Sequence, residues 1–443
     1  MERREALILG GALAFSGVLG AQELLNSNNK EKQSVLINNA VVFDGRKALS
    51  GNNNVLVVGN KIAKISSSAI TPPQNTKVVD AQGKFLMPGL SDAHWHVMFA
   101  AAGLDSVNLP DPGLFYAAAV TEAQDTVLRG FTTVRDMAGA SFGIKKAIDS
   151  GMITGPRIFP SGAFISQTSG HGDFAPAYEN APEFGGERSE LERLGNFRVV
   201  NGVPEVLAAV REQLKKGASQ IKIGAGGGVI SDFDPLDSVQ FSLDEIKAAV
   251  GAAKDWGTYV CSHVYNVDGI RKALDGGVRS IEHGQLADEE TIKRIGNVGA
   301  WLSIQAFEGH FLAGSKGKIL NGKWRDALKM ALKHKVKYAF GTDILFSPEL
   351  ASFQNEALVT FAEILSPLQT LVMATSGNAE LFEMSGKRNP YIGGKLGVLE
   401  PGAWADMILI DGNPLKDIEV LKQYKDKFVF ILKDGNIIKS TIA

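Results

Sequence analysis

Cysteine is almost absent from this chain. Cys261 is the only one among 443 residues, so no disulfide can form within the chain and a cysteine-rich metal site is excluded. A single thiol also leaves the redox compartment undetermined, because the usual indicator of an oxidising environment is a set of paired cysteines.

An excess of charge of either sign is also missing. The 46 basic and 48 acidic side chains give a formal net charge of −2, which provides no field to hold a phosphate backbone or an anionic bilayer. Nucleic acid is therefore not an expected partner. Hydrophobic residues at 44% and charged residues at 21% are ordinary globular values. We expect a small-molecule substrate, and a homo-oligomer is compatible with this composition.

Long hydrophobic runs are absent apart from a short one at the start. Arg3 and Arg4 precede an apolar, small-residue run over residues 6–21, and polar sequence follows. This pattern is typical of an export signal, and the run is too short and glycine-rich to favour a permanent membrane span. We predict a signal peptide over residues 1–21, secretory or twin-arginine in type, and a periplasmic or secreted mature protein without a stable membrane span. An ordinary N-terminal helix or a frayed tail is the alternative.

The two ends of the chain share a β-rich texture. Short apolar or alternating runs broken by Gly, Asn and Pro fill residues 34–88, and similar runs occur at 405–411 and 428–436. We predict that both ends meet in one small β-sandwich domain made of residues 34–88 plus 386–443.

Between these ends, over residues 89–385, strand-like runs alternate with helix-length amphipathic segments. The candidate strands number eight: 90–97, 132–136, 157–165, 220–224, 259–265, 280–283, 301–307 and 338–342. Such alternation favours a closed parallel barrel over an open doubly wound sheet. The sequence thus predicts an α/β protein whose catalytic domain is a (β/α)₈ TIM barrel.

Histidines and an aspartate stand at the ends of the candidate strands, where a (β/α)₈ barrel keeps its reacting groups. His94 and His96 are two residues apart on the first strand, which points both imidazoles to one face. A hydrogen-bonded surface pair and a metal chelate are both open for such a spacing. His263 and His283 end the fifth and sixth strands and Asp343 follows the eighth; taken singly, a hydrogen-bonded core histidine or a helix cap is the simpler interpretation.

Lys222 lies between two isoleucines on the fourth candidate strand, which should be buried on both faces. An unpaired ammonium is costly there, so the side chain must be paired, neutralised or converted. Carbamylation by carbon dioxide would give a two-oxygen anion able to bridge two cations, and pairing with a carboxylate at the barrel mouth is the alternative. Six such side chains at strand ends favour a divalent-metal site over six independent structural roles.

The strand ends carry five short motifs, in this order: Met87-Pro-Gly-Leu-Ser-Asp-Ala-His-Trp-His, Ile221-Lys-Ile, Val260-Cys-Ser-His, Ser280-Ile-Glu-His-Gly and Gly341-Thr-Asp. The chain then closes with Gly397-Val-Leu-Glu-Pro-Gly-Ala-Trp-Ala-Asp-Met-Ile-Leu-Ile. This ordered set resembles the amidohydrolase superfamily over about residues 34–440. Within it, the chain is most similar to the prolidase and Xaa-Arg carboxypeptidase-like branch, which includes ochratoxin-cleaving amidases.

The resemblance implies a binuclear centre with two divalent ions, zinc being the expected metal. The implied ligands are His94, His96 and Asp343 for one ion, His263 and His283 for the other, and carbamylated Lys222 as the bridge. A hydroxide shared by two such ions is a strong nucleophile at neutral pH, and Asp343 could carry its proton to the leaving nitrogen. The implied function is hydrolysis of an amide bond that releases the C-terminal residue of dipeptides or N-acyl amino acids.

Two further residues extend the resemblance. His171, in Thr168-Ser-Gly-His-Gly-Asp, and Tyr265, two residues beyond His263, match positions that in those relatives contact the tetrahedral centre and the substrate's terminal carboxylate. The two-residue spacing independently puts Tyr265 on the same face as His263. A hydrogen bond that orders the loop (His171) and a packing role at the barrel rim (Tyr265) stay open.

Other functions fit the same residues. A cyclic amide, an imidazolone ring or a lactone could be the substrate of the same metal site. A non-catalytic exported binding protein that retains the barrel is a third interpretation, although such a protein would have no need of a complete ligand set.

Overall fold

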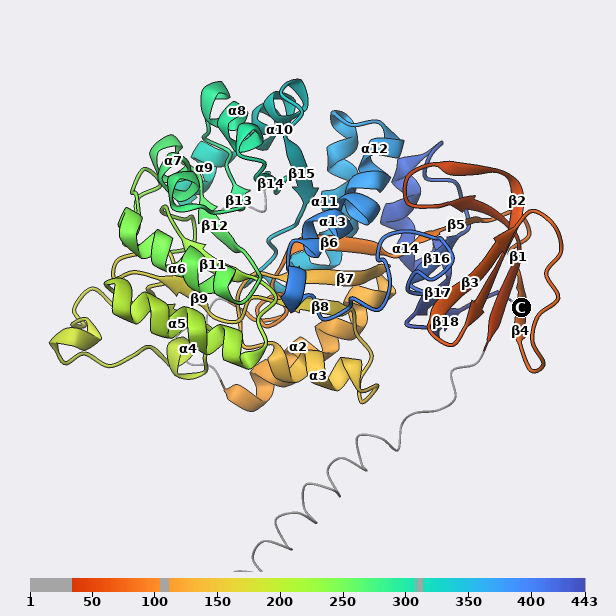
Figure 1. Cartoon of the computed structure of the whole chain (residues 1–443), viewed down its shortest axis with the longest axis horizontal. Helices are drawn as coiled ribbons and strands as arrows, with labels where there is room; N and C mark the ends of the chain where they lie inside the picture. Colours follow the sequence, from red (N-terminus) through yellow and green to blue (C-terminus); the bar gives the residue numbers. More distant parts are fainter. Residues whose placement is uncertain (1–33, 104–110, 307, 309–313, 443) are drawn as a thin grey trace, which may run out of the picture.

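The computed structural model describes residues 34–103, 111–306, 308 and 314–442. They form a barrel that packs against a separate β-sheet, at the left and right of Figure 1. The predicted signal peptide, residues 1–21, lies outside the described residues. Among the helices of the described part, none is both long and apolar enough to cross a membrane.

The separate sheet is built from both chain ends. Its eight strands are β1 (Val35–Phe43), β2 (Ala48–Val58), β3 (Lys61–Ser66), β4 (Lys77–Asp80), β5 (Phe85–Pro88), β16 (Met407–Ile410), β17 (Phe428–Lys433) and β18 (Asn436–Ser440). The ends join where β5 pairs antiparallel with β16. The edge strand β3 bonds back to the segment before β16, because the Ile62 amide donates to the Ala403 carbonyl (3.0 Å). The prediction that the two chain ends meet in one β-structure is confirmed, and their strands belong to one continuous sheet.

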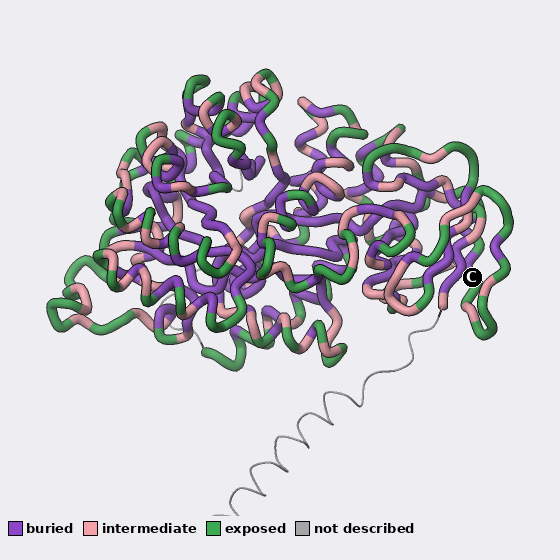
Figure 2. Tube along the Cα trace, viewed as in Figure 1, coloured by how far each residue is buried: buried purple, intermediate pink, exposed green. Residues whose placement is uncertain are grey.

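The barrel contains the eight predicted strands, each running parallel to its hydrogen-bonded neighbours, and the predicted (β/α)₈ fold is confirmed. These strands are β6 (Leu90–Trp95), β7 (Phe131–Asp136), β8 (Arg157–Pro160) with β9 (Phe164–Ser166), β11 (Ile221–Gly224), β12 (Val260–Val264), β13 (Ser280–His283), β14 (Trp301–Ile304) and β15 (Lys337–Phe340). Most residues of these strands are buried, and Figure 2 shows much of the barrel interior in the purple of buried residues.

The third predicted strand, residues 157–165, is divided in the structure. Gly162 has a φ of +73°, a left-handed conformation that breaks the extended chain, so β8 ends before it and β9 begins after it. β8 pairs with β7, whereas β9 pairs with β11 and with an additional short strand, β10 (Phe197–Val199). The barrel therefore consists of a three-stranded sheet, β6-β7-β8, and a seven-stranded sheet, β10-β9-β11-β12-β13-β14-β15.

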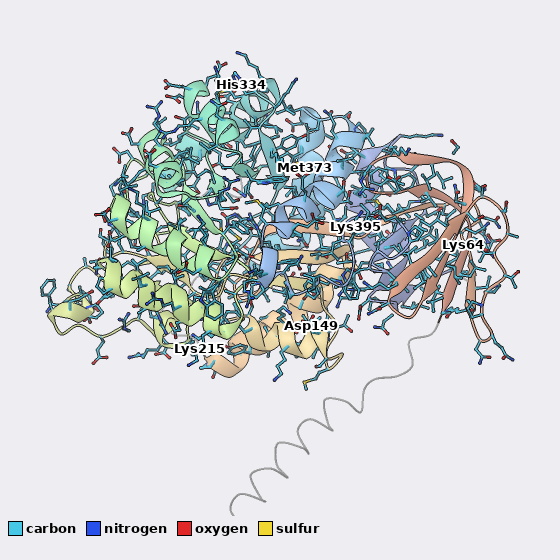
Figure 3. All side chains as sticks on the ribbon, in the orientation of Figure 1. Lys64, Asp149, Lys215, His334, Met373 and Lys395 are labelled. Atoms are coloured by element: carbon cyan, nitrogen blue, oxygen red, sulfur yellow. The ribbon has the colours of Figure 1, made fainter. Side chains whose placement is uncertain are left out.

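Helices cover the outside of the barrel and connect its strands. They are α2 (Pro112–Leu128), α3 (Phe142–Asp149), α4 (Glu190–Arg193), α5 (Val203–Lys216), α6 (Leu243–Asp255), α7 (Val267–Gly276), α8 (Glu289–Asn297), α9 (Gly314–Leu320), α10 (Trp324–Lys333), α11 (Gln354–Thr360), α12 (Pro367–Val372), α13 (Asn378–Glu383) and, in the second domain, α14 (Tyr424–Lys427). Local sequence sets their ends: Ser242, Asn266 and Asp288 accept the amide hydrogen bonds of N-caps, and Gly277 ends α7 with a φ of +95°. Charged groups such as Lys215 lie at the periphery (Figure 3).

The barrel closes between β6 and β15 through the residues that surround its mouth. The Asp343 amide donates to the His94 carbonyl (2.7 Å). The buried Asp92 carboxylate accepts hydrogen bonds from the Thr342 amide (3.2 Å), the Thr342 hydroxyl (2.7 Å) and the Gln354 amide group (3.0 Å). The closure of the barrel and the placing of the predicted ligands thus depend on the same contacts.

Gly341 lies against β6 so closely that a larger residue has no room. A Cβ at this position would lie 2.4 Å from His94 Cβ and 2.7 Å from the His94 nitrogen. We predict that Gly341→Ala lowers the free energy of unfolding by about 1–3 kcal/mol, because the backbone of β6 must move. The matched control is Gly251→Ala, since no atom lies within 4 Å of a Cβ on that helical glycine; it should stabilise the protein slightly. Equal melting temperatures for the two variants would contradict the prediction.

Candidate metal centre

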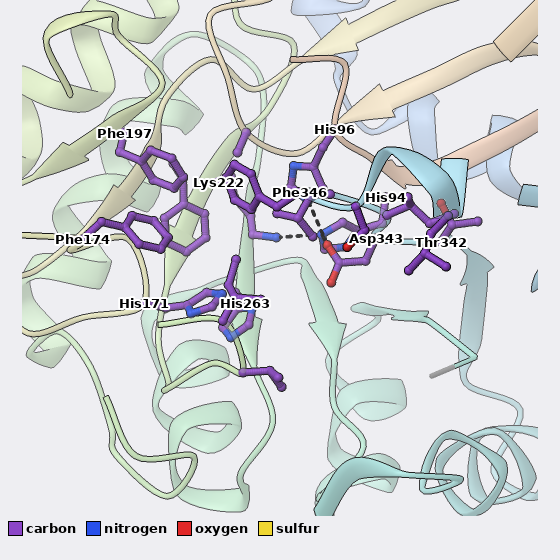
Figure 4. Close-up of a pocket in the computed structure, with 18 of the residues that line it drawn as sticks. His94, His96, His171, Phe174, Phe197, Lys222, His263, Thr342, Asp343 and Phe346 are labelled. Atoms are coloured by element: carbon purple, nitrogen blue, oxygen red, sulfur yellow. Dashed lines mark hydrogen bonds and ion pairs between the residues drawn. The ribbon is translucent and has the colours of Figure 1, made fainter. Parts of the chain in front are cut away.

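The six side chains predicted to bind metal converge at one end of the barrel, and Figure 4 shows five of them, all except His283. His94, Lys222 and His263 lie on β6, β11 and β12, while His283 is the last residue of β13. The His94 and His283 ring centroids are 4.9 Å apart, and those of His263 and His283 are 4.4 Å apart. The histidines and the lysine are buried, so ionised forms are costly unless a partner or a cation compensates them.

Three of these side chains could hold one cation. His94 Nε2 lies 3.2 Å and His96 Nε2 lies 2.8 Å from Asp343 Oδ1, and one ligand atom from each residue lies within 4.8 Å of the other two. Burial lowers the pKa of His96 to about 4, which leaves this imidazole neutral near pH 7, the form that binds metals. Burial opposes ionisation of Asp343, but the neighbouring His94 and His96 hold the pKa of Asp343 well below its usual value. Two imidazoles and one carboxylate are a donor set that suits a divalent ion such as zinc.

Lys222 points toward these histidines. Its Nζ atom lies 3.3 Å from His94 Nε2 (Figure 4), and its side chain is 1% exposed. Within the described part of the chain, no carboxylate oxygen comes within 4.0 Å of this amine. Burial lowers the pKa of Lys222. The carboxylate pairing that the sequence left open is therefore not the arrangement of the described residues, and the amine is a candidate for conversion.

Two of the candidate ligands adopt left-handed backbone conformations. The φ angles are +77° at His283 and +57° at Asp343, where only glycine is free of strain. His283 is the last residue of β13 and Asp343 lies three residues after the end of β15, so in both places the extended chain is interrupted where the candidate ligand stands. Strain of this kind concentrates at functional sites.

Glu282 is a site residue that the sequence analysis missed. Its carboxylate lies 3.0 Å from His94 Nδ1, and Arg135 Nη2 donates to both of its oxygens at 2.8 Å. Burial would raise the pKa of Glu282, but Arg135 holds it well below the usual value. An ionised carboxylate accepts a hydrogen bond from Nδ1–H of His94 and so favours the tautomer in which Nε2 carries the lone pair and faces Asp343 and Lys222.

Glu282 was not predicted because His283, the next residue, was predicted to face the site. Strand alternation puts neighbouring residues on opposite faces, so that prediction gave no reason to expect Glu282 in the barrel interior. The left-handed turn at His283 lets both side chains reach the barrel interior. An acidic residue on one buried strand and Arg135 on another could have suggested the pair, because neither charge can be buried alone.

His171 and Tyr265 line the same cavity as the candidate ligands, a space of about 370 Å³. The His171 ring stacks on His263 with centroids 4.0 Å apart, and its Nδ1 lies 2.7 Å from the Ser231 hydroxyl. The Tyr265 ring lies 5.0 Å from that of His263. Burial raises the pKa of Tyr265 well above its usual value, so its hydroxyl stays a proton donor. His171 therefore both makes a hydrogen bond that can order the loop at Ser231 and lines the cavity.

A buried network holds the loop that carries the His171 partner. Asp234 accepts the Gly228 amide (2.7 Å) and lies 3.5 Å from His171 Nδ1. Lys316, on α9, donates to the carbonyls of Gly228 (2.9 Å) and Asp234 (2.8 Å). Neither residue was predicted from the sequence, because Asp234 lies in a loop without periodicity and Lys316 lies outside the candidate strands.

Comparison with known proteins identifies the family. The chain matches the amidohydrolase family over residues 85–443. An ochratoxinase of Aspergillus niger is 32% identical over 411 residues, which cover 87% of this chain and 83% of that protein.

Solved structures of a prolidase and a dipeptidase have the same fold as this chain. A prolidase complexed with N-methylphosphonate-L-proline superposes with a TM-score of 0.84 and 34% identity, over 92% of this chain and all of that one. A Xaa-Pro dipeptidase with bound methionine in its active site superposes with a TM-score of 0.76 and 28% identity, over 91% of this chain and 99% of that one.

Replacing Glu282 should weaken metal binding. We predict that Glu282→Gln raises the dissociation constant for Zn²⁺ by about 10–100-fold, because the neutral amide no longer fixes the His94 tautomer. Competition with a chromophoric chelator measures this constant without any substrate. The matched control is Glu289→Gln, which removes a carboxylate paired with Lys333 on the outer surface and should leave the constant unchanged. Equal constants for the two variants would show that Glu282 does not position His94.

Proposed function

Because the chain belongs to the amidohydrolase family, we propose that it is a binuclear metal-dependent hydrolase that releases the C-terminal residue of dipeptides or N-acyl amino acids. Its relatives establish the coarser activity, hydrolysis of amide and peptide carbon–nitrogen bonds. The metal number, the substrate class and the roles of single residues are the proposal.

The observation that carries the proposal is the burial of Lys222 among imidazoles without a carboxylate partner in the described structure. A carbamate on Nζ would replace a costly buried amine by an anion facing His94 and near Asp343. Its two oxygens could serve two cations, one also held by His94, His96 and Asp343 and the other by His263 and His283. This donor set of imidazoles and carboxylates fits two zinc ions.

Two bound divalent cations would supply an activated water and polarise the scissile carbonyl. The protein side chains would transfer protons and bind the substrate. Asp343, ionised in the cavity, accepts a proton from the attacking water and returns it to the leaving nitrogen. His171 and Tyr265 face the same cavity, where the imidazole and the phenol can donate hydrogen bonds to the oxygen that becomes negative in the transition state or to the carboxylate of the substrate.

The proposal is tested by an activity screen of zinc-reconstituted protein. Dipeptides and N-acyl amino acids are compared with cyclic amides, an imidazolone and lactones, and ninhydrin detection or mass spectrometry follows the products. We expect hydrolysis in the first group. Turnover confined to cyclic amides or lactones would replace the proposed substrate class, and a folded protein with no metal and no turnover would favour a binding protein.

The control for this screen is Asp343→Asn, which keeps the size of the side chain but cannot accept a proton. We expect kcat to fall by about 10²–10⁴-fold, more than KM changes. If kcat were unaltered in Asp343→Asn, Asp343 would not be the residue that carries the proton.

Lys222 gives a second test. We predict that reconstitution of the wild-type protein depends on bicarbonate and that ¹³C-bicarbonate gives a carbamate NMR signal that Lys222→Met lacks. The variant should remain folded, because an apolar chain replaces a buried amine, but it should lose the greater part of its bound metal. Lys215→Met, on the exposed face of α5, is the control and should behave as wild type. Full activity without bicarbonate and without the signal would contradict carbamylation.

A further inference from the structure

One side of the cavity, which adjoins the candidate metal ligands, is rich in aromatic rings. Four phenylalanines line it: Phe164, Phe174, Phe197 and Phe346. They come from β9, the loop after it, β10 and the segment after β15. Figure 4 shows Phe174 and Phe197 on the far side of Lys222 from Asp343. We call these four residues the aromatic wall.

The rings of the aromatic wall form a continuous cluster. Phe164 and Phe197 meet edge to face with centroids 6.1 Å apart, and Phe197 and Phe174 with centroids 5.1 Å apart. Phe174 reaches Phe346 at 6.5 Å, and Phe164 reaches the ring of His263 at 6.2 Å. The cluster is therefore a preformed apolar surface that begins beside a metal-ligand candidate, and edge-to-face contacts of this kind fix the ring orientations.

Few of the described residues that line the cavity are ionisable. Among the described residues that line it, the ionisable side chains are Lys222, Asp343, Tyr265 and the histidines of the centre, and no arginine or glutamate is present. Aliphatic side chains such as Ile230 and Leu350 extend the apolar surface. A carboxylate on the substrate would lose its hydration against this wall without gaining a charged partner. A guanidinium or ammonium would gain only a cation–π contact, as Lys222 Nζ makes with the Phe164 ring at 5.6 Å, and such a contact offsets little of the hydration that the cation loses.

We propose that the aromatic wall receives a bulky apolar group, aromatic or branched aliphatic, carried by the substrate next to the scissile amide, and rejects a charged group there. This inference rests on the proposed function, because it assigns the side-chain class of the amide that the same site cleaves. The group belongs either to the leaving amino acid or to the acyl part, and two substrate series distinguish these sources.

The first experiment measures kcat/KM in both series. N-acetyl-Phe, -Leu, -Arg and -Glu vary the leaving residue, and Phe-Gly, Leu-Gly, Arg-Gly and Glu-Gly vary the acyl part. In at least one series the apolar substrates should exceed both charged ones by about a hundredfold, the discrimination a hydrophobic pocket can reach. Charged substrates that match or exceed the apolar ones in both series would overturn the inference and leave the proposed function intact.

The second experiment shortens the wall at Phe174, which is half-buried and so tolerates truncation. Phe174→Ala should lower kcat/KM for the preferred aromatic substrate at least tenfold more than for its glycine counterpart. Phe184→Ala is the control, because Phe184 is 81% exposed in the same connecting region, and it should change neither. Equal losses for both substrates in Phe174→Ala would assign Phe174 a merely structural role and overturn the inference.

A binding measurement keeps the inference testable if no amide is cleaved. Calorimetric titration of the zinc-loaded protein with N-acetyl-L-phenylalanine and N-acetyl-L-arginine compares the two side chains without turnover. Tighter binding of the phenylalanine compound, lost in Phe174→Ala, would support the aromatic wall even if the proposed reaction failed. Equal or tighter binding of the arginine compound would overturn it.

Discussion

A buried lysine amine that has no carboxylate beside it among the described residues is the constraint on which the site depends. Lys222 lies on a strand buried on both faces, and its Nζ meets the Nε2 atom of His94. Desolvation disfavours an ammonium there. Glu282 forms an ion pair with Arg135, and the same carboxylate accepts a hydrogen bond from His94 Nδ1, which leaves His94 Nε2 toward the lysine. These buried groups form a polar network that borders the cavity.

The geometry of that open end is obtained at the expense of local strain. His283 and Asp343 both have positive φ angles, conformations that cost on the order of 1–3 kcal/mol each when the residue is not glycine. Gly341, which leaves no space for a side chain against His94, brings β15 near enough to β6 for the Asp343 amide to bond the His94 carbonyl. Packing that is favourable elsewhere in the barrel holds these residues where relaxed strands would not put them.

Sequence patterns predicted the architecture well because burial of parallel strands leaves a strong signal. The alternation of strands and helices gave the barrel, and the polar residues at strand ends gave the six converging side chains. Three features escaped for physical reasons. Glu282 was hidden by the left-handed turn at His283, Gly162 divides a strand that reads as continuous, and the partner of His171 lies in a loop without periodicity. Distances between strands, and hence the aromatic wall, depend on tertiary packing that one sequence does not display.

Because the barrel is divided at Gly162, the candidate metal ligands at its mouth come from two different sheets. His94 and His96 belong to the three-stranded sheet and its end, whereas Lys222, His263 and His283 belong to the seven-stranded sheet, and Asp343 follows its last strand. The two sheets are held along one seam by the Asp92 carboxylate. An ion bound by ligands from both sheets would stabilise the contact between them, because its binding free energy adds to the stability of the folded barrel. Loss of such an ion and separation of the two sheets would then be thermodynamically coupled.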